Sequence, residues 1–350
     1  MASSTFTQRV RTRILIISDT HCALPRPSDN NTNDDRVPFQ YPLPTADVLV
    51  HCGDLTSNGR VEQHLKALEL INSISAELKI VIPGNHDLTL DRAYYDRYPN
   101  EHCGWHKYSD DVLREIKDMY ESEKTRERGI RYLEEGTASF TLKSGARLNV
   151  YASGWQPEFC NWAFGYSRDH DRYNRPLQGG SGPGNPVPDF DTAGGGVDIM
   201  ITHGPPKGLL DRTVDGMEVG CEHLLEAVRR CRPLVHCFGH IHEGWGALVK
   251  DWDVAERPLL TASEDTTDEV LESSMPPSCN TDTPDSIKKR EKDVTVPDYE
   301  EQARQRGVFV DATGLKHGKE TLFVNASIMT HWYKPLQAPW IVDVDLPMAT

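Results

Sequence analysis

Five short segments of the sequence combine Asp, His or Asn side chains with glycine, each directly after an apolar run. They are Ser18-Asp19-Thr20-His21, His51-Cys52-Gly53-Asp54, Pro83-Gly84-Asn85-His86-Asp87, Thr202-His203-Gly204 and Gly239-His240-Ile241-His242. Carboxylate oxygens and imidazole nitrogens are common ligands of Mn, Fe, Zn and Ni in proteins. In extended backbone, alternate residues share one side, so an Asp-x-His or His-x-His pair directs both side chains to one pocket. These segments together predict a site for divalent cations.

The predicted chemistry is phosphoester hydrolysis. Two cations about 3.5–4 Å apart can hold a phosphoryl group and activate a hydroxide for in-line attack. Asp54 has two carboxylate oxygens and could bridge two cations, whereas Asn85 offers a neutral oxygen. Each segment alone has an ordinary explanation, because Gly and Asn are frequent turn residues and a single His often packs in a core. The ordered conjunction of all five favours a site with two metals.

The elements that must position these residues can be predicted from apolar runs bounded by turn residues. Strands are expected at about 14–17, 48–51, 79–82, 147–151, 197–202, 234–238, 321–324 and 340–344, and helices at 61–73, 110–123 and 220–230. Strands that alternate with helices predict an α/β layered fold. The later strands follow one another without helices, so we expect part of the sheet system to be antiparallel or mixed. All five polar segments lie at the ends of predicted strands, where α/β folds usually bind ligands.

The chain length of 350 residues is compatible with a single domain over residues 1–350 that carries loop insertions. We expect insertions at about 25–44, 91–129 and 167–196. A fourth insertion, at about 251–306, is acidic, rich in Ser, Thr and Pro, and has little hydrophobic periodicity. Such a composition buries too little apolar surface to offset the entropy of ordering, so we predict that this insertion is flexible.

Composition narrows the function classes. The chain has 53 acidic and 38 basic residues, a net charge of −15, which argues against polymeric nucleic acid as a partner. No apolar run approaches the ~20 residues of a membrane span, and the polar N-terminus does not resemble a signal peptide. The eight cysteines form no Cys-x-x-Cys pair and are expected to be free thiols. We therefore expect a cytoplasmic protein without a membrane partner.

The five segments resemble the signature motifs of the calcineurin-like metallophosphoesterases. Further stretches, Trp155-Gln156-Pro157, Asn161-Trp162-Ala163-Phe164 and Phe323-Val324-Asn325-Ala326-Ser327 among them, resemble the branch of small metallophosphoesterase-domain-containing proteins. The resemblance covers roughly 12–91, 140–164, 197–249 and 320–347. It implies an α/β (α+β layered) fold in which a two-sheet β-sandwich is flanked by helices.

The resemblance also implies a role for each site residue. The first metal would be held by Asp19, His21, Asp54 and His242, and the second by Asp54, Asn85, His203 and His240. His86 would lie beside the phosphate, and a hydroxide bridging the two metals would be the nucleophile. The implied cofactors are two divalent ions, with Mn the first choice and Fe, Zn, Ni or Mg as alternatives.

The expected function is therefore metal-dependent hydrolysis of a small phosphodiester or phosphomonoester. Protein phosphatases of the superfamily carry an Asp and an Arg after Gly-Asp, whereas this chain has Ser57 and Asn58 there, which argues against that activity. The main alternative is a binding or scaffolding protein that keeps the fold without turnover. A third interpretation keeps the metals but uses them in non-hydrolytic chemistry.

Two sets of side chains allow more than one interpretation. The aromatic residues Trp155, Trp162, Phe164 and Trp245 could form a pocket for an aromatic group or pack in the core. His51 and His236 are expected in the core or behind the metal ligands.

Overall fold

The computed structural model describes residues 8–27, 36–98, 107–175, 186–191, 196–253 and 291–349. Within these residues the strands form two large sheets and one small one. The first sheet has the order β13 (Val308–Asp311), β15 (Trp340–Pro347), β1 (Arg9–Ile17), β2 (Val48–His51), β3 (Leu78–Val81) and β4 (Ile130–Tyr132). The second has the order β12 (Glu291–Asp293), β11 (Gly246–Asp251), β14 (Glu320–Asn325), β10 (Val235–Phe238), β9 (Ile199–Thr202), β6 (Arg147–Ser153) and β5 (Glu135–Thr141). The short strands β7 (Gln156–Pro157) and β8 (Gly165–Tyr166) pair with each other.

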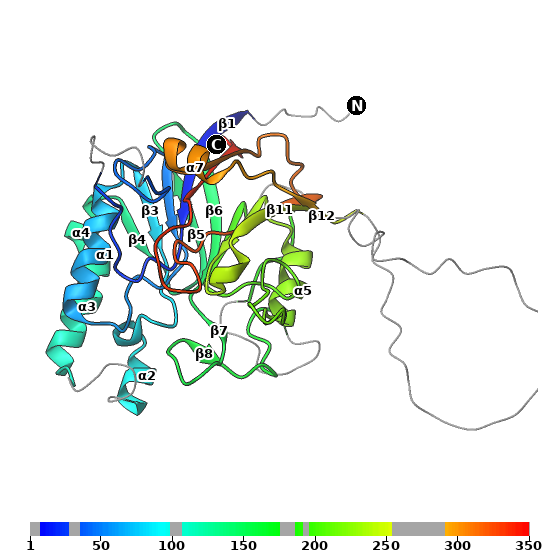
Figure 1. Ribbon diagram of the computed structural model, residues 1–350. Coiled ribbons are helices and arrows are strands. Elements are labelled where there is room, and N and C mark those ends of the chain that lie inside the picture. The colour runs from blue at the N-terminus through cyan, green and yellow to red at the C-terminus, as the bar shows by residue number, and fades with distance from the viewer. Residues whose placement is uncertain are drawn as a thin grey trace, which may run out of the picture.

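Helices cover the outer faces of the two large sheets (Figure 1). The helices α1 (Val61–Ser73), α3 (Asp110–Glu121) and α4 (Glu123–Glu127) lie on one side, and α5 (Glu222–Cys231) lies on the other. The short helices α2 (Arg92–Arg97) and α7 (Tyr299–Gln305) lie at the ends of the molecule. Mixed parallel and antiparallel pairing occurs in both large sheets. The predicted α/β layered fold with a two-sheet sandwich is confirmed.

The core explains why the central strands read as continuous apolar runs. In β1, Ile14 and Ile16 pack between the two sheets, whereas Leu15 and Ile17 pack against the layer of α1 and α3. Each central strand is therefore buried on both faces, which removes the polar alternation of a strand with one wet face. On the other side of the molecule, Leu224 of α5 packs in a separate cluster on the outer face of the second sheet.

The acidic insertion contains regular secondary structure where the structure describes it. Residues 254–290 of the predicted segment lie outside the described residues. In the remainder, β12 pairs antiparallel with β11, and α7 begins after Asp298, whose side chain accepts from the Glu301 amide. Ala303 of α7 is 2% exposed, and its carbonyl accepts a 2.7 Å hydrogen bond from Gln40. Residues 291–306 thus contain a strand and a helix that contact other segments, and the flexibility of the insertion as a whole stays a prediction.

Other strands were not predicted. The strands β4, β5, β11 and β13 were missed because they are short, or because they lie at or near a sheet edge and have few fully buried residues. The predicted insertion at 91–129 contains α2, α3 and α4. Among the described residues, no helix has the length and apolar character needed to cross a membrane.

Candidate metal centre

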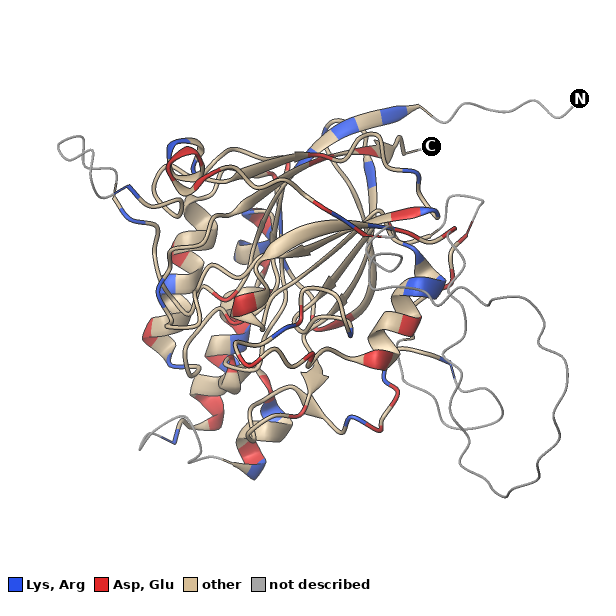
Figure 2. Ribbon diagram, turned by 45° about the vertical axis from the view of Figure 1, so that its right-hand side comes forward, with Lys and Arg blue, Asp and Glu red and all other residues tan. Residues whose placement is uncertain are grey.

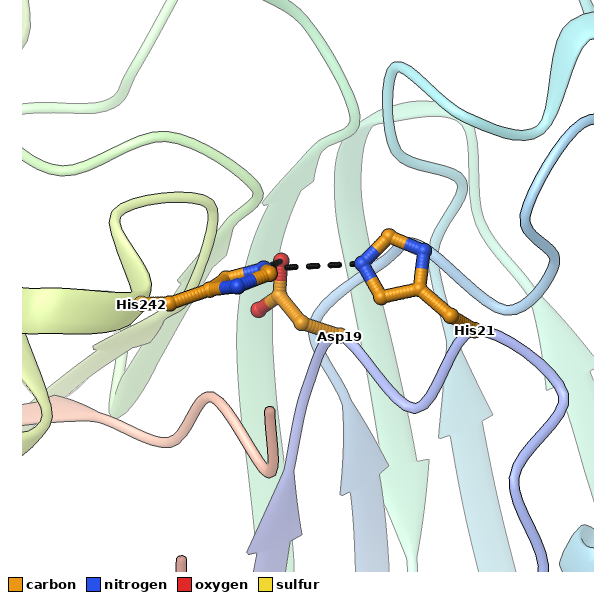
Figure 3. Close-up of side chains that lie close together, drawn as sticks. All are labelled: Asp19, His21 and His242. Atoms are coloured by element: carbon orange, nitrogen blue, oxygen red, sulfur yellow. Dashed lines mark hydrogen bonds and ion pairs between the residues drawn. The ribbon is translucent and has the colours of Figure 1, made fainter. Parts of the chain in front are cut away.

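The polar segments of the sequence meet where the parallel strands of both large sheets end. The strands β1, β2 and β3 run parallel in one sheet, as do β6, β9 and β10 in the other. Backbone hydrogen bonds join the segments that follow them, for example from the Asp19 amide to the Gly53 carbonyl at 3.0 Å. Figure 3 shows the result for Asp19 and His21, which follow β1, and for His242, which follows β10: the three side chains extend toward one point.

The backbone of the site residues is strained. Asp19, His21, Asp54 and His240 have φ angles of 51°, 44°, 54° and 67°, in the left-handed region that side chains other than glycine rarely adopt. Such conformations cost free energy and persist where the surroundings enforce them, commonly at functional sites. Here they turn four polar side chains back toward the space between the strand ends.

Glycine is required where these segments touch. A Cβ atom on Gly53, whose φ is 98°, would lie 2.6 Å from Nδ1 of His203 and 2.7 Å from the Pro83 carbonyl oxygen. A Cβ atom on Gly239 would overlap the side chains of Asp19 and Ser18. The glycines therefore permit the close approach that brings the polar groups together.

One pair of imidazoles presents lone pairs to each other. Nδ1 of His21 lies 3.1 Å from the Thr56 carbonyl, and Nδ1 of His242 lies 3.2 Å from the Thr330 carbonyl. Because a carbonyl only accepts, each Nδ1 carries the proton in the neutral ring, and each Nε2 is left with a lone pair. The two Nε2 atoms are 3.5 Å apart, and that of His242 is 3.4 Å from Oδ1 of Asp19. Facing acceptors of this kind require a cation or an added proton between them.

A second set of acceptors surrounds His203. Its Nδ1 is 2.9 Å from the Cys52 carbonyl, so the neutral ring again directs a lone pair from Nε2. That Nε2 lies 2.8 Å from the side-chain oxygen of Asn85 and 3.4 Å from Oδ1 of Asp54. Backbone carbonyls that hold the outer nitrogen of a histidine are the usual support of a metal ligand.

Among the described residues, Asp171, His223 and Glu226 bring their ligand atoms within 4.8 Å of one another outside the predicted site, and three further groups do so within it. They are Asp19, His21 and His242; Asp19, Asp54 and His203; and His21, Asp54 and His86. Asp19 and Asp54 each belong to two groups, so the groups are contiguous. The donor set of carboxylates and neutral imidazoles fits divalent ions of the first transition row.

The predicted ligand His240 is the one imidazole of the set that lies in none of these groups of described residues. Its ring lies 5.0 Å from the His203 ring, between centroids, and its amide donates to the Asp19 carboxylate at 3.0 Å. Its role as a ligand stays a prediction, as do those of the other site residues.

Burial controls the protonation of the centre. Burial raises the pKa of Asp54 well above its usual value, and the neighbouring Asp19 and Asp87 carboxylates raise it further. Burial lowers the pKa of His21 and His203, and it lowers that of His240 to about 3, so these rings are neutral at pH 7. Neutral imidazole is the form that binds metals.

Asp19 and His242 behave as a pair. Burial opposes the charge on both, but their mutual hydrogen bond and attraction prevail, which lowers the pKa of Asp19 and raises that of His242. A proton on His242 can therefore balance Asp19 when no cation is bound. A divalent cation would replace that proton, because metal ligands bind in their deprotonated form.

His86 lies at the edge of the candidate centre. Its Nδ1 is 2.8 Å from the Ser57 carbonyl, and its amide donates to Oδ1 of Asp54 at 2.8 Å. Its ring lies 4.6 Å from the His21 ring and stacks on Trp162. Burial lowers its pKa to about 4. Protein phosphatases have an Asp at the position of Ser57. In this chain the backbone carbonyl of Ser57 orients His86 instead.

Three groups that support the centre were not singled out by the sequence. The buried Asp87 carboxylate accepts from the amides of Gly84, Leu55 and Thr56, which links two site segments. The Ser327 hydroxyl donates to Asp19 at 2.9 Å. Position after a strand was the available signal for Asp87 and Ser327.

Tyr333 is the third group. Its ring lies 5.1 Å from that of His21 and 5.0 Å from that of His242, and the residue is 55% exposed. It lies in a loop, and no sequence pattern distinguished it.

The two histidines expected behind the ligands take that position. His51 Nε2 is 2.9 Å from the Thr20 hydroxyl, and His236 Nε2 is 2.9 Å from the Thr202 hydroxyl. The Thr202 hydroxyl donates to the Gly204 carbonyl at 2.7 Å, so His236 must be the donor in this pair. Each threonine adjoins a predicted metal ligand, and these pairs therefore hold the ligand segments in position.

Comparison with known proteins decides the family. The calcineurin-like phosphoesterase family matches residues 12–244, which include every predicted site residue. The chain belongs to this family. The calcineurin-like fold and the resemblance noted in the sequence are thereby confirmed.

Individual relatives agree with this assignment. The chain is 34% identical over 240 residues to metallophosphoesterase domain-containing protein 1 of Homo sapiens and of Mus musculus, a match that covers 68% of this chain and 63% of each relative. The chain therefore spans less than two thirds of these curated relatives. It is also 31% identical over 247 residues to a protein of Emericella nidulans named probable rhamnogalacturonate lyase C, covering 70% of this chain but 18% of that protein.

Proposed function

We propose that this calcineurin-like phosphoesterase hydrolyses a small phosphodiester or phosphomonoester at a centre of two divalent metal ions. The observation that carries the proposal is the convergence of imidazole nitrogens and side-chain oxygens that face one another as acceptors. Nε2 of His21, Nε2 of His242 and a carboxylate oxygen of Asp19 converge, and Nε2 of His203 faces oxygens of Asn85 and Asp54. Two cations would satisfy both sets.

The proposed ligands are those predicted from the sequence, with Asp54 shared between the two ions. Asp54 supports this role because its Oδ1 lies 3.4 Å from His203 Nε2 and its Oδ2 lies 3.7 Å from His21 Nε2. When bound, two divalent ions would neutralise charge on the phosphoryl group and lower the pKa of the attacking water.

His86 would act on the substrate side. Its Nδ1 proton is engaged by the Ser57 carbonyl, which aims Nε2 away from the backbone. From there it would hydrogen bond to a phosphoryl oxygen or to the leaving oxygen. Trp162 holds the ring from the other side, so that little rotational freedom is lost when substrate binds.

The charge of the protein favours a small substrate over a polymeric one. Acidic and basic residues are interspersed along the elements in Figure 2, and the net charge is −15. A small phosphoester needs only the local positive charge of the metals, whereas a nucleic-acid polymer needs an extended basic surface. We therefore favour a small substrate, with Mn as the first choice of metal.

The test combines metal analysis with a substrate panel. Purified protein should contain close to two divalent ions per chain after loading with Mn, Fe, Zn, Ni or Mg. A bis-aryl phosphate, an aryl phosphate, cyclic nucleotides and nucleotides should then be assayed with each metal. Turnover that is lost in Asp54→Asn and kept in the exposed-site control Glu115→Gln supports the proposal. Tight metal binding without turnover of any phosphoester would instead favour a binding or scaffolding protein.

A further inference from the structure

A cavity adjoins the candidate centre on the side of Trp162. The indole ring stacks on the imidazole of His86, with ring centroids 4.0 Å apart and planes inclined by 28°. The same indole lines a cavity of about 330 Å³, which is near the lower end of the range for small-molecule pockets. Trp162 is therefore shared between the proposed catalytic residue and the cavity.

Four of the ten residues that line this cavity are aromatic: Tyr94, Tyr98, Trp155 and Trp162. The lining also includes the charged side chains of Arg97, Asp91 and Glu158. The Arg97 guanidinium lies 5.1 Å from the centroid of the Tyr98 ring. Aromatic side chains bind a flat ring more tightly than they bind an alkyl chain. Offset stacking and edge-to-face contacts with the ring add to the free energy gained by burying its area.

The loop between β7 and β8 that carries the indole is strained and firmly held. Cys160, Asn161 and Phe164 have φ angles of 51°, 55° and 53°. The Tyr94 hydroxyl donates to the Asn161 carbonyl at 2.7 Å, and the Phe164 amide donates to the Asp91 carboxylate at 2.8 Å. Left-handed conformations at three residues other than glycine are retained where a fixed geometry serves a function.

Trp155 is also fixed. The Arg172 guanidinium lies 3.8 Å from the Trp155 ring centroid and donates to both carboxylate oxygens of Glu135, at 2.7 and 2.9 Å. The other two aromatic residues considered in the sequence do not line the cavity: Phe164 is 1% exposed and packs edge to face against Trp155, and Trp245 packs against Trp340 in the core. The cavity thus has two preformed tryptophan walls.

The geometry points to this cavity as the binding site for the aromatic leaving group of the phosphoester. This inference rests on the proposed function and names the substrate class as aryl phosphoesters. In hydrolysis the water oxygen bonds to phosphorus as the bond from phosphorus to the aryl oxygen breaks. The aryl oxygen leaves with the bonding electron pair and receives the proton that the water releases. If His86 lies beside the aryl oxygen, the aryl ring bonded to that oxygen extends past Trp162 into the cavity.

The test compares two esters that differ in the shape of the leaving group. One is an aryl methyl phosphate and the other a fluoroalkyl methyl phosphate, chosen so that the leaving alcohols have the same pKa. Ala93→Trp fills the cavity, because Ala93 lines it from α2 and is exposed. The matched control is Glu115→Trp, at an exposed position of α3 that does not line the cavity.

Wild-type protein should prefer the aryl ester, and Ala93→Trp should reduce that preference about tenfold, mainly by raising KM for the aryl ester. The fluoroalkyl ester should be hydrolysed equally by wild type, Ala93→Trp and Glu115→Trp. An equal loss for both esters, or no loss for either, would overturn the assignment of the cavity.

A binding measurement separates this inference from the proposed function. Benzylphosphonate and butylphosphonate carry CH2 in place of the leaving oxygen and cannot be hydrolysed. Calorimetry on the metal-loaded protein should show that Ala93→Trp weakens benzylphosphonate about tenfold and leaves butylphosphonate unchanged. If wild type hydrolyses neither ester and no member of the substrate panel, the proposed function fails. The phosphonates still decide the cavity, because equal weakening of both, or weakening of neither, rejects the assignment.

Discussion

Replacing Asp54 with asparagine should change stability in opposite directions with and without metal. Asp54 is buried close to Asp19, and its pKa is raised well above the usual value. In the metal-free protein at pH 7, moving Asp54 from the unfolded chain, where it is ionised, into this buried site therefore destabilises the fold. The substituted asparagine would keep an oxygen for the His86 amide and could present an NH2 group to Nε2 of His21, which now lies 3.7 Å from Oδ2 of Asp54.

The magnitude follows from two terms. Removing a buried, uncompensated carboxylate should raise the free energy of unfolding of the chelated protein by about 1–3 kcal/mol. In wild type, free metal at 100 times Kd should raise the free energy of unfolding by about 2.7 kcal/mol for one site. For a chain of this size, that increase corresponds to roughly 5 °C in Tm. Asp54→Asn should lose most of that increment, because the shared ligand would carry no charge. The variant should therefore be more stable than wild type in chelator and less stable in saturating metal.

The sign of the pH dependence is fixed by the raised pKa. A carboxyl group whose pKa is higher in the folded state destabilises the fold fully above that raised pKa. The destabilisation shrinks as the pH falls below it and is gone only below the ordinary pKa of the unfolded chain. The advantage of Asp54→Asn in chelator should therefore be present at pH 7 and shrink as the solution is acidified. Thermal melts in chelator and in Mn, over a pH series, measure both effects.

The control is Asp343→Asn, a buried carboxylate far from the centre that receives two hydrogen bonds from Arg13, at 2.8 and 2.9 Å. Asp343→Asn should destabilise the protein in chelator and leave the metal-induced shift in Tm unchanged. The reasoning about Asp54 is refuted if Asp54→Asn is destabilised in chelator like the control and still gains the full shift with metal.

Three further predictions concern activity, the acidic segment and acid stability. His86→Ala should lower kcat by about 10²–10⁴-fold and leave the metal-induced Tm shift intact; unchanged kcat in a steady-state assay would contradict its role. Replacing residues 254–290 with a short Gly-Ser loop should keep activity within about twofold, whereas extending the deletion through 306 should lower Tm by removing α7, as thermal melts would show. Arg13 lowers the pKa of Asp343. Wild type should therefore exceed Asp343→Asn in free energy of unfolding by about 1 kcal/mol at pH 7, and this difference should vanish as the pH falls through the lowered pKa. A difference that stays constant in thermal melts at acid pH would contradict this.

Much of the fold was predictable because its central strands are local patterns. The runs at 14–17 and 48–51 are apolar over nearly their whole length, since each strand is buried on both faces. The same locality made the motifs visible, because each ligand pair follows its own strand within a few residues. The edge strands β5 and β12 escaped prediction, since their side chains are half exposed and their order depends on a neighbouring strand.

The sequence by itself determined which donor types gather at the strand ends, and therefore the class of chemistry. The tertiary structure decided which atoms of those donors face the centre. His203 directs Nε2 inward because its Nδ1 meets the carbonyl of Cys52, 151 residues away in the chain. Likewise, the stacking of Trp162 on His86 joins segments with no local relation. Residue type sets what a side chain can bind, but its orientation depends on hydrogen bonds and packing between distant segments, which form only when the sheets close over one core.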